Sequence, residues 1–263
     1  MPKYGGVKMD GMGGDADVAR AAGLMAEPAR AKVLMALADG RALPASLLAS
    51  EAAVSPQTIS GHLHKLLDGG LVAVERSGRQ RYYKLSGPDV AAAVEALARI
   101  AKPQPIKSLR QSTRAAALRE ARTCYDHLAG RLGVALLDGL VRRDALRRTD
   151  GGVGADRRPD DPLAKQLPDG PYALGSKASE VFAELGVDLA DQPSRRQLLR
   201  FCVDWSEQRH HLSGQLGASV VDSLLVNNWL HRRPNQRAVD LTPAGHEALA
   251  GLLGADLRVG AEG

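Results

Sequence analysis

Cysteine and histidine side chains, which bind soft and borderline metal ions, occur close together at two places in the second half of the chain. Cys124 is followed by His127, and Cys202 is followed by His210 and His211. We predict that the first pair shares one face of a helix over residues 113–140 and that the second group lies on the next long helix. Arginine residues beside both cysteines would lower the pKa of the thiols. These groups are therefore candidates for a metal or redox centre.

Aromatic side chains in the same region suggest a second use, a pocket for a small molecule. Only 3% of the residues are aromatic, yet both tryptophans lie here. Converging polar groups beside an apolar wall are typical of ligand pockets. Buried cysteines and tryptophans also often do no more than fill a core, so the cofactor and the metal stay unknown. The candidate ligand-binding residues are Cys124, Tyr125, His127, Cys202, Trp205, His210, His211 and Trp229.

These groups belong to a sequence that occurs twice. His127-Leu-Ala-Gly-Arg-Leu-Gly recurs as His211-Leu-Ser-Gly-Gln-Leu-Gly, and a weaker similarity follows near Leu174 and Leu241. We predict a duplicated region over residues 111–257, with one copy at about 111–189 and the other at about 195–257. In each copy a helix, a polar connection, a short strand and a helix give a degenerate winged-helix pattern.

The polar connections of the two copies differ in composition. Residues 231–240 are basic and predict a hairpin, whereas residues 147–171 are rich in glycine, proline and aspartate and predict a poorly ordered loop. Glycine is unfavourable inside a helix. The repeated glycines of the predicted helices therefore indicate close packing at Gly130, Gly133, Gly214 and Gly217.

A second candidate site lies in the first third of the chain, on a helix predicted to begin at Pro56. Ser55 can cap its first amide groups, and the paired glycines at positions 69 and 70 end it. The apolar residues of this helix fall on one face. The polar residues, among them Gln57, His64 and Lys65, point the other way and are free to contact a partner.

A basic hairpin follows this helix directly. Residues 71–76 and 79–85 are predicted strands joined at Ser77-Gly78, and Arg76, Arg79 and Arg81 lie near the tip. Each element alone could be an ordinary solvated surface. Together, in this order, they are typical of a protein that places a helix in the major groove of DNA and a hairpin on the phosphates.

Two further helices, over residues 27–40 and 44–54, complete this unit. With them the chain resembles the ArsR-like (arsenical-resistance repressor) family of winged helix-turn-helix regulators. The resemblance covers about residues 15–100. It rests on Pro28-x-Arg30 with Leu34 and Leu37, on Ser55-x-x-Thr58-Ile59-Ser60-x-His62-Leu63-x-x-Leu66, on Gly70-Leu71-Val72, and on Gly78-Arg79-x-x-Tyr82-Tyr83-x-Leu85.

The resemblance implies a homodimer that represses an operator in double-stranded DNA and releases it when an inducer binds. It places residues of the helix start on bases and the arginines on the wing. His62 matches the motif but lies near the apolar edge, where packing or a phosphate contact fits better than base reading. The candidate DNA-binding residues are Ser55, Gln57, Thr58, Ser60, Gly61, His62, His64, Lys65, Arg76, Arg79 and Arg81.

The familiar metal sites of the resembled family are missing from this winged helix. Residues 47–52 contain no cysteine, where the family has a Cys-x-Cys motif, and residues 89–101 contain no histidine. Metal sensing therefore does not follow from the resemblance. If the chain has a sensor, we expect it in the C-terminal region, coupled to the DNA-binding domain through the helix over residues 89–101.

Length and charge agree with a DNA-binding protein of more than one domain. The 263 residues carry a net charge of +5 and a pI near 9.4, which favour polyanionic partners. We predict a flexible arm (1–14), a winged helix-turn-helix DNA-binding domain (15–101), a linker (102–110) and a duplicated sensor and dimerisation domain (111–257). With two cysteines, no apolar run of membrane length and no signal-peptide core, we expect a cytoplasmic protein without membrane contact.

The expected fold is α+β, mainly helical with small β-hairpin wings: an N-terminal winged helix-turn-helix followed by two degenerate winged-helix-like repeats. Motifs for nucleotide binding or serine hydrolysis do not occur, so we do not expect an enzyme. We predict a dimeric repressor released by an inducer, which is a small molecule, a metal or a redox signal. Two alternatives stay open: a metal- or redox-responsive regulator that uses Cys124 and Cys202, and an architectural DNA-binding protein without an inducer.

Overall fold

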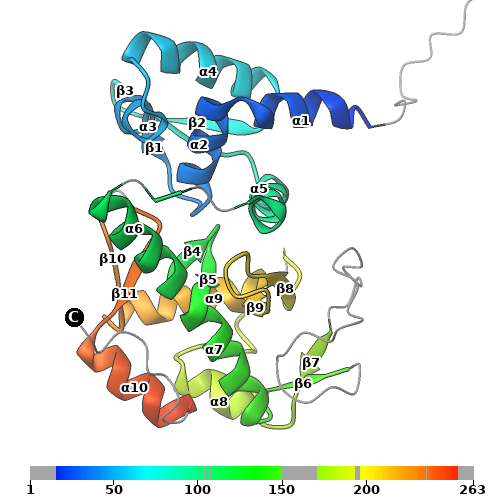
Figure 1. Ribbon diagram of the computed structural model, residues 1–263. Helices are drawn as coiled ribbons and strands as arrows, with labels where there is room; N and C mark the ends of the chain where they lie inside the picture. The colour runs from blue at the N-terminus through cyan, green and yellow to red at the C-terminus, as the bar shows by residue number, and fades with distance from the viewer. Residues whose placement is uncertain are drawn as a thin grey trace, which may run out of the picture.

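The computed structural model describes residues 16–102, 105–106, 108–149, 171–192, 196–234 and 236–253. They form an N-terminal and a C-terminal body, which meet below helix α5 (Pro88–Ile100) in Figure 1. The predicted N-terminal arm and nearly all of the predicted loop over residues 147–171 lie outside the described residues. No described helix has both the length and the apolar character needed to cross a bilayer.

The N-terminal body is a winged helix. Its helices pack around a three-stranded antiparallel sheet in the order β1-β3-β2. Ile59, Leu63 and Leu66 are buried, as the apolar face of the predicted helix requires. The elements, in chain order before α5, are α1 (Val18–Ala26), α2 (Pro28–Leu37), β1 (Leu43–Pro44), α3 (Ala45–Ala52), α4 (Pro56–Asp68), β2 (Val72–Ser77) and β3 (Gln80–Leu85).

Local sequence sets both ends of α4. Ser55 Oγ accepts a hydrogen bond from the backbone amide of Thr58 at 3.1 Å, and Pro56 occupies the first turn, where a missing N–H costs nothing. Past the other end, Gly70 has φ +69°, a left-handed conformation that favours glycine. These predictions of the helix start and stop are confirmed, and the hairpin β2–β3 follows as expected.

The C-terminal body runs twice through the order hairpin, helix, hairpin, helix. After α6 (Leu109–Glu120), the first series is β4 (Arg122–Cys124), β5 (His127–Ala129), α7 (Gly130–Arg142), β6 (Leu146–Arg148), β7 (Tyr172–Leu174) and α8 (Ala178–Glu184). The second is β8 (Arg200–Val203), β9 (His210–Ser213), α9 (Gly214–Val226), β10 (Leu230–Arg232), β11 (Val239–Leu241) and α10 (Pro243–Leu253). The hairpin predicted over residues 231–240 is present as β10–β11. The winged-helix-like character of the repeats stays a prediction.

The predicted helix over residues 113–140 is wrong. The chain leaves α6 after Glu120, forms the hairpin β4–β5 and becomes helical again only at Gly130. Long-range pairing explains the break: the amide of Thr123 donates to the carbonyl of Arg237 at 3.0 Å, and the amide of Val239 donates to that of Ala121 at 3.1 Å. The prediction that Cys202, His210 and His211 lie on a long helix is also wrong. These residues lie on the hairpin β8–β9, which corresponds to β4–β5 in the first copy.

The two copies are interleaved. Helix α7 packs on strand β9 of the other copy, helix α9 packs on strand β5, and the strands β5 and β9 contact one another. A Cβ atom on Gly133 would lie 2.4 Å from the carbonyl oxygen of Leu128, and one on Gly217 would lie 3.0 Å from Cβ of His127. The predicted close packing therefore holds at these two glycines and also at Gly130 and Gly214, where a Cβ atom would lie within 3 Å of backbone atoms. The packing of each helix on the other hairpin brings the residues of β5 and β9 together.

Candidate functional site in the winged helix and between the C-terminal hairpins

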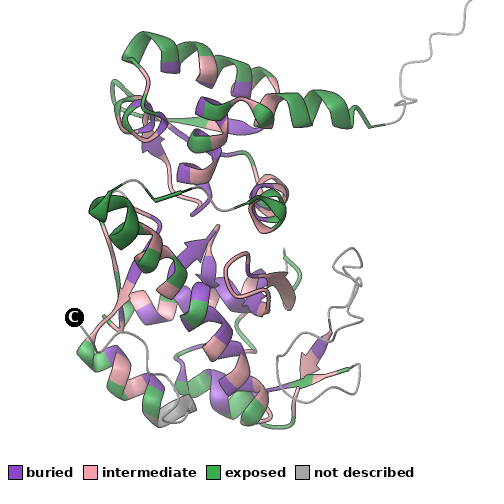
Figure 2. Ribbon diagram, viewed as in Figure 1, coloured by how far each residue is buried: buried purple, intermediate pink, exposed green. Residues whose placement is uncertain are grey.

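One candidate surface is the outer face of α4. Apart from His62, every residue of this helix named as a candidate DNA contact is exposed, as is the cap residue Ser55 (Figure 2). A Cβ atom on Gly61 would meet no heavy atom within 4 Å, so the backbone there is open to a partner. An exposed polar helix face of this kind can reach the base edges of the major groove.

The wing adds positive charge to this surface. Arg76 pairs directly across the hairpin with Arg81, and Arg79 lies at the turn; all three side chains are exposed. Like charges facing one another across a hairpin are unfavourable without a counter-charge. The phosphates of DNA would supply that charge.

His62 differs from its neighbours on α4. Its side chain is only 17% exposed, and Nδ1 lies 3.3 Å from a carboxylate oxygen of Glu27, the cap residue of α2. This position agrees with the interpretation of His62 as a packing residue. His62 is therefore less accessible to a partner than the exposed polar residues of α4.

The second candidate site is a cluster of two cysteines and two histidines between the C-terminal hairpins. In β4–β5 Cys124 faces His127 across the hairpin, and in β8–β9 Cys202 faces His211. One ligand atom each from Cys124, His127 and His211 lie within 4.8 Å of one another. Cys202 adjoins them, because its thiol interacts with Cys124 and with both imidazoles. We call these four residues the Cys–His cluster.

Each imidazole of the cluster is held from one side by a carboxylate. Nδ1 of His127 lies 3.3 Å from Asp126, and Nδ1 of His211 lies 3.5 Å from Asp204. Both histidines are buried. Nε2 of each ring, and Nδ1 of His211, make no conventional hydrogen bond with any residue that the structure describes. The rings themselves lie close, with centroids 5.1 Å apart.

The pKa values of the two thiols of the cluster are shifted in opposite directions. Hydrogen bonding with Cys202, together with burial, raises the pKa of the Cys124 thiol well above its ordinary value. The same hydrogen bond, with help from both imidazoles, lowers the pKa of Cys202 well below its ordinary value. Burial would lower the pKa of His127, but the Cys202 thiolate and the Asp126 carboxylate outweigh it and raise this pKa to about 9. The two thiols therefore have opposite pKa shifts, and the pKa of His127 between them is raised.

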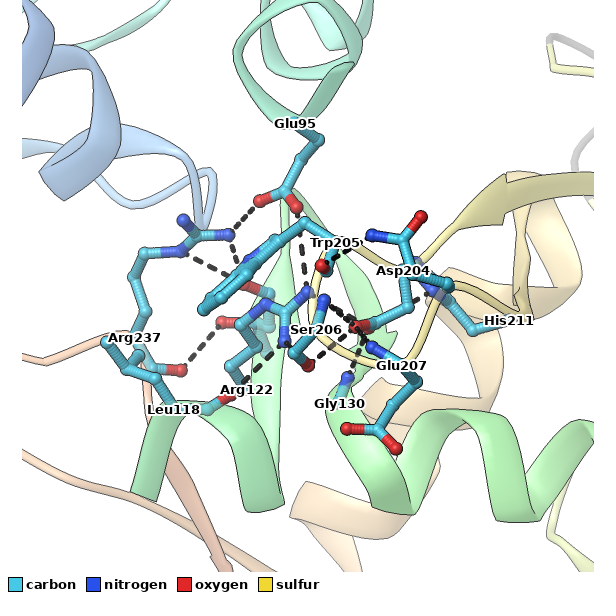
Figure 3. A network of polar contacts seen from close by, with 12 residues as sticks. Glu95, Leu118, Arg122, Gly130, Asp204, Trp205, Ser206, Glu207, His211 and Arg237 are labelled. Carbon is cyan, nitrogen blue, oxygen red and sulfur yellow. Dashed lines mark hydrogen bonds and ion pairs between the residues drawn. The ribbon is translucent and has the colours of Figure 1, made fainter. Parts of the chain in front are cut away.

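Asp204 joins the cluster to the rest of the molecule (Figure 3). Its buried carboxylate accepts hydrogen bonds from Gly130 N–H at 2.6 Å and from Arg122 Nη2 at 2.9 Å, besides those from Ser206 and Glu207. Burial opposes ionisation, but Arg122, His211 and these hydrogen bonds lower the pKa of Asp204. Arg122 also lies 4.7 Å from the centre of the Trp205 ring, a cation–π contact.

The network continues into the winged helix through Glu95 of α5. Arg122 Nη2 lies 3.6 Å from one oxygen of Glu95, and Arg237 donates a short hydrogen bond to the other. All three side chains are buried, and the two arginines lower the pKa of Glu95 against the effect of burial. A series of buried polar contacts therefore leads from His211 through Asp204 and Arg122 to Glu95.

Four of the eight predicted ligand-binding residues form the Cys–His cluster, and four lie elsewhere. Tyr125 is at the turn of β4–β5, where its amide donates to Ala38 and its side chain packs on the core of the winged helix. His210 contacts Tyr172, on the other side of β9 from His211, and Trp229 packs against the C-terminal core. Trp205 lines a cleft of about 1450 Å³ between the two bodies.

The prediction of site residues missed Glu95, Arg122 and Arg237. A signal for Glu95 was present, because it is a charged residue beside Val94 on a helix otherwise rich in alanine. Asp126 and Asp204 also had a signal, since each follows its cysteine in a Cys-x-Asp pattern. Nothing local marks Arg237, whose partners lie far away in the sequence.

Known proteins are similar to this chain in the winged helix, and one relative is similar over most of its length. A helix-turn-helix domain model matches residues 25–75. The chain is 37% identical over 230 residues to the uncharacterized HTH-type transcriptional regulator YdfF of Bacillus subtilis (strain 168), a match that spans 87% of this chain and 93% of the relative. The chain belongs to the ArsR-like family of winged helix-turn-helix transcriptional regulators.

Two solved structures similar to this ArsR-like regulator each cover about a third of the chain. HlyU from Vibrio cholerae is 30% identical with a TM-score of 0.30, covering 31% of this chain and 88% of HlyU. The homodimeric winged helix-turn-helix domain of Mb0332 from Mycobacterium bovis is 31% identical with a TM-score of 0.29, covering 33% and 86%. The match to YdfF is longer, so it includes most of the C-terminal body that carries the Cys–His cluster.

Proposed function

We propose that this transcriptional regulator is a dimeric, cytoplasmic repressor and that an inducer bound in its C-terminal body releases it from its operator. The observation that carries the proposal is the buried contact of Glu95 with Arg122 and Arg237. Glu95 belongs to the winged helix, and both arginines belong to the C-terminal body. A change at the arginines therefore acts directly on α5.

Further contacts between the two bodies support control of one by the other. Arg41 donates to the carbonyl of Gln236 at 2.6 Å, and Arg114 forms a two-pronged ion pair with Glu51 of α3. Helix α3 packs directly against α4. A ligand shifts the equilibrium between the DNA-binding and the released state only if it binds the two states with different affinities. The contacts between the two bodies are interactions that could be formed in one state and broken in the other.

The dimer is supported by apolar side chains that lie on the surface of the N-terminal body. Helix α1 has no buried residue, and Val18 on it is 70% exposed. Ile100, at the end of α5, is 75% exposed. Burial of these residues against a second copy would remove them from water.

One observation favours a small molecule as the inducer. The cleft between the bodies is lined by apolar residues of both, among them Met35, Leu97 and Trp205, and it adjoins Arg122 through the Trp205 ring. An apolar molecule with a hydrogen-bond acceptor fits this lining, since Trp205 Nε1 is buried without a hydrogen-bond partner among the described residues. A ligand in this cleft would contact Trp205, which packs on Arg122, and Arg122 in turn contacts Glu95.

The repressor proposal is tested with the full-length protein. A duplex that the protein selects from random DNA is placed across a promoter, and transcription is measured with and without the protein. We expect transcription to fall with wild-type protein and to stay unchanged with the Arg79→Ala, Arg81→Ala double variant. Increased transcription would overturn the repressor assignment, and failure to select any sequence would overturn sequence-specific binding.

A further inference from the structure

We propose that Cys124, His127, Cys202 and His211 together bind one zinc-like divalent metal ion in tetrahedral geometry, and that this ion is an input of the regulator. The inference about regulation rests on the proposed control of DNA binding by the C-terminal body. The inference about the site itself rests only on the residues of the Cys–His cluster.

The composition of the cluster suits this class of ion. Two thiolates and two neutral imidazoles are a donor set preferred by tetrahedral zinc, and four protein ligands leave no open position for catalysis. Two thiolates also cancel the charge of a divalent ion, so the bound site would be neutral overall. Neutrality matters because an uncompensated charge at this buried place is unfavourable.

The spacing of the donor atoms is close to that of a bound ion. Metal–sulfur bonds of about 2.3 Å and metal–nitrogen bonds of about 2.0 Å place tetrahedral ligand atoms about 3.3 to 3.8 Å apart. The ligand atoms of Cys124, His127 and His211 already lie within 4.8 Å of one another. A contraction of about 1 Å among these three atoms is within reach of side-chain rotation. Cys202, which pairs with His211 across β8–β9, would supply the fourth ligand.

The surroundings of the imidazoles are those of metal ligands. Metal-binding histidines almost always have their second ring nitrogen held by a carboxylate, a carbonyl or water. Here Nδ1 of His127 lies 3.3 Å from Asp126, and Nδ1 of His211 lies 3.5 Å from Asp204 without a conventional hydrogen bond. Nε2 of both buried rings also lacks a conventional hydrogen bond to a described residue. A buried nitrogen without a partner is unfavourable unless something else satisfies it. A metal ion would satisfy both.

The fold explains why the four ligands meet. Each hairpin contributes one cysteine and one histidine as a cross-strand pair, and the helix after each hairpin packs on the other hairpin. Neither copy alone has more than two of the four ligands. The ion would therefore bridge the two copies, and the duplication would be needed for the site.

Asp204 provides a route from the ion to the DNA-binding body. Its Oδ2 atom is shared by Arg122 and His211, at 2.9 and 3.5 Å. A metal ion on Nε2 polarises the ring and strengthens the Nδ1–H contact with Asp204. A stronger contact between His211 and Asp204 would weaken the hydrogen bond from Arg122 to Asp204. The Arg122 guanidinium group would then shift toward Glu95 of α5.

The site is tested by cobalt spectroscopy on the reduced, metal-free, full-length protein. We expect one equivalent of Co²⁺ to give the intense visible absorption of a tetrahedral ion and the near-ultraviolet band of thiolate-to-cobalt charge transfer, and Zn²⁺ to abolish both. The wild-type spectrum needs no variant, so misfolding cannot imitate the result. Absence of binding, or a weak six-coordinate spectrum without charge transfer, would overturn the site.

Variants assign the ligands. Cys124→Ser and Cys202→Ser should each reduce the charge-transfer band and weaken Co²⁺ binding by about 100-fold or more, whereas Asp126→Asn should keep the band and weaken binding by about 10- to 100-fold. His231→Ala removes an exposed histidine and serves as the control, with an unchanged titration. Full charge transfer in the Cys124→Ser, Cys202→Ser double variant would place the ion elsewhere and overturn the assignment. If the spectra hold while Zn²⁺ leaves operator affinity unchanged, the site stands and the proposed regulation fails.

Discussion

Arg122 donates a hydrogen bond to Asp204 across 2.9 Å, and neither side chain is exposed to solvent. The pair connects two hairpins that are far apart in the sequence, and Arg122 also contacts Glu95 of the winged helix. Buried ion pairs are weak evidence of stability, because desolvation offsets much of their attraction. The pair of Arg122 and Asp204 is better understood as a connection between the two hairpins and the winged helix. A rearrangement of this pair would therefore affect all three.

Glu95→Gln should weaken the contact between the two bodies of the protein. The substitution removes the negative charge that compensates two buried guanidinium groups, so we expect a loss of about 3 kcal/mol in the free energy of unfolding. Urea denaturation measures it. The matched control is Glu51→Gln, whose pair with Arg114 is partly exposed and should contribute less than about 1 kcal/mol. Equal effects of the two variants would contradict a special role for Glu95.

The stability difference between wild type and Glu95→Gln should depend on pH. Because the folded-state pKa of Glu95 lies below the ordinary value of 4.5, its contribution is fully present above that value and is lost as the pH falls through the lowered pKa. Denaturation at neutral pH and below pH 4 tests this. A difference that grows on acidification would contradict the assigned sign.

Replacement of Arg79 and Arg81 by alanine should weaken binding to all DNA sequences alike. Each lost phosphate contact reduces the magnitude of the negative slope of log affinity against log salt by about 0.9, so the double variant should reduce that magnitude by about 2. Fluorescence anisotropy at several salt concentrations measures this slope. Lys177→Ala, an exposed cation on the other body, is the control and should leave the slope unchanged. An unaltered slope in the double variant would remove the wing from the interface.

Gly61→Ala should affect folding and DNA binding in opposite directions. The site has room for a Cβ atom, and alanine is a better helix former than glycine, so we expect the free energy of unfolding to rise by about 0.5 to 1 kcal/mol. If DNA approaches this backbone closely, operator affinity should fall in the same protein. Stable protein with unchanged affinity would show that DNA does not contact α4 at Gly61.

Dimerisation should depend on the end of α5. Ile100→Glu places a charge on the surface that we assign to the dimer, and light scattering should show a shift from about twice the chain mass toward the monomer. Val226→Glu is the matched control: Val226 is 80% exposed, but it lies on α9 in the other body. Monomeric wild-type protein, or an Ile100→Glu variant that dimerises as well as wild type, would contradict this interface.

The elements that depend on neighbouring residues were predictable from the sequence. Ser55, Pro56 and Gly70 act within one or two turns of α4, so their types alone indicated where the helix begins and ends. The two-residue turn at Gly78 likewise set the wing, and the ArsR-like family followed from this ordered set of residues. The polar face of α4 was predictable because its apolar face has a helical period.

The hairpins of the C-terminal body were not predictable in this way. The segment from Ala121 to Ala129 lies between helix-forming residues, and its turn has Tyr125 at φ 58° instead of the asparagine or glycine that usually marks such a turn. Its extended form is held by Arg237, Ala238 and Val239, more than a hundred residues away along the chain. The right residue types were therefore identified in Cys124 and His127, but on the wrong element.

Operator affinity of the full-length protein, measured by fluorescence anisotropy with and without one equivalent of Zn²⁺, tests the central claim that the C-terminal body controls DNA binding. We expect Zn²⁺ to raise the Kd of wild-type protein by about 5- to 150-fold, the range typical of coupled sites. The effect should disappear in Glu95→Gln, which still binds the metal. The same Kd for the metal-free and the zinc-loaded wild-type protein would contradict the account.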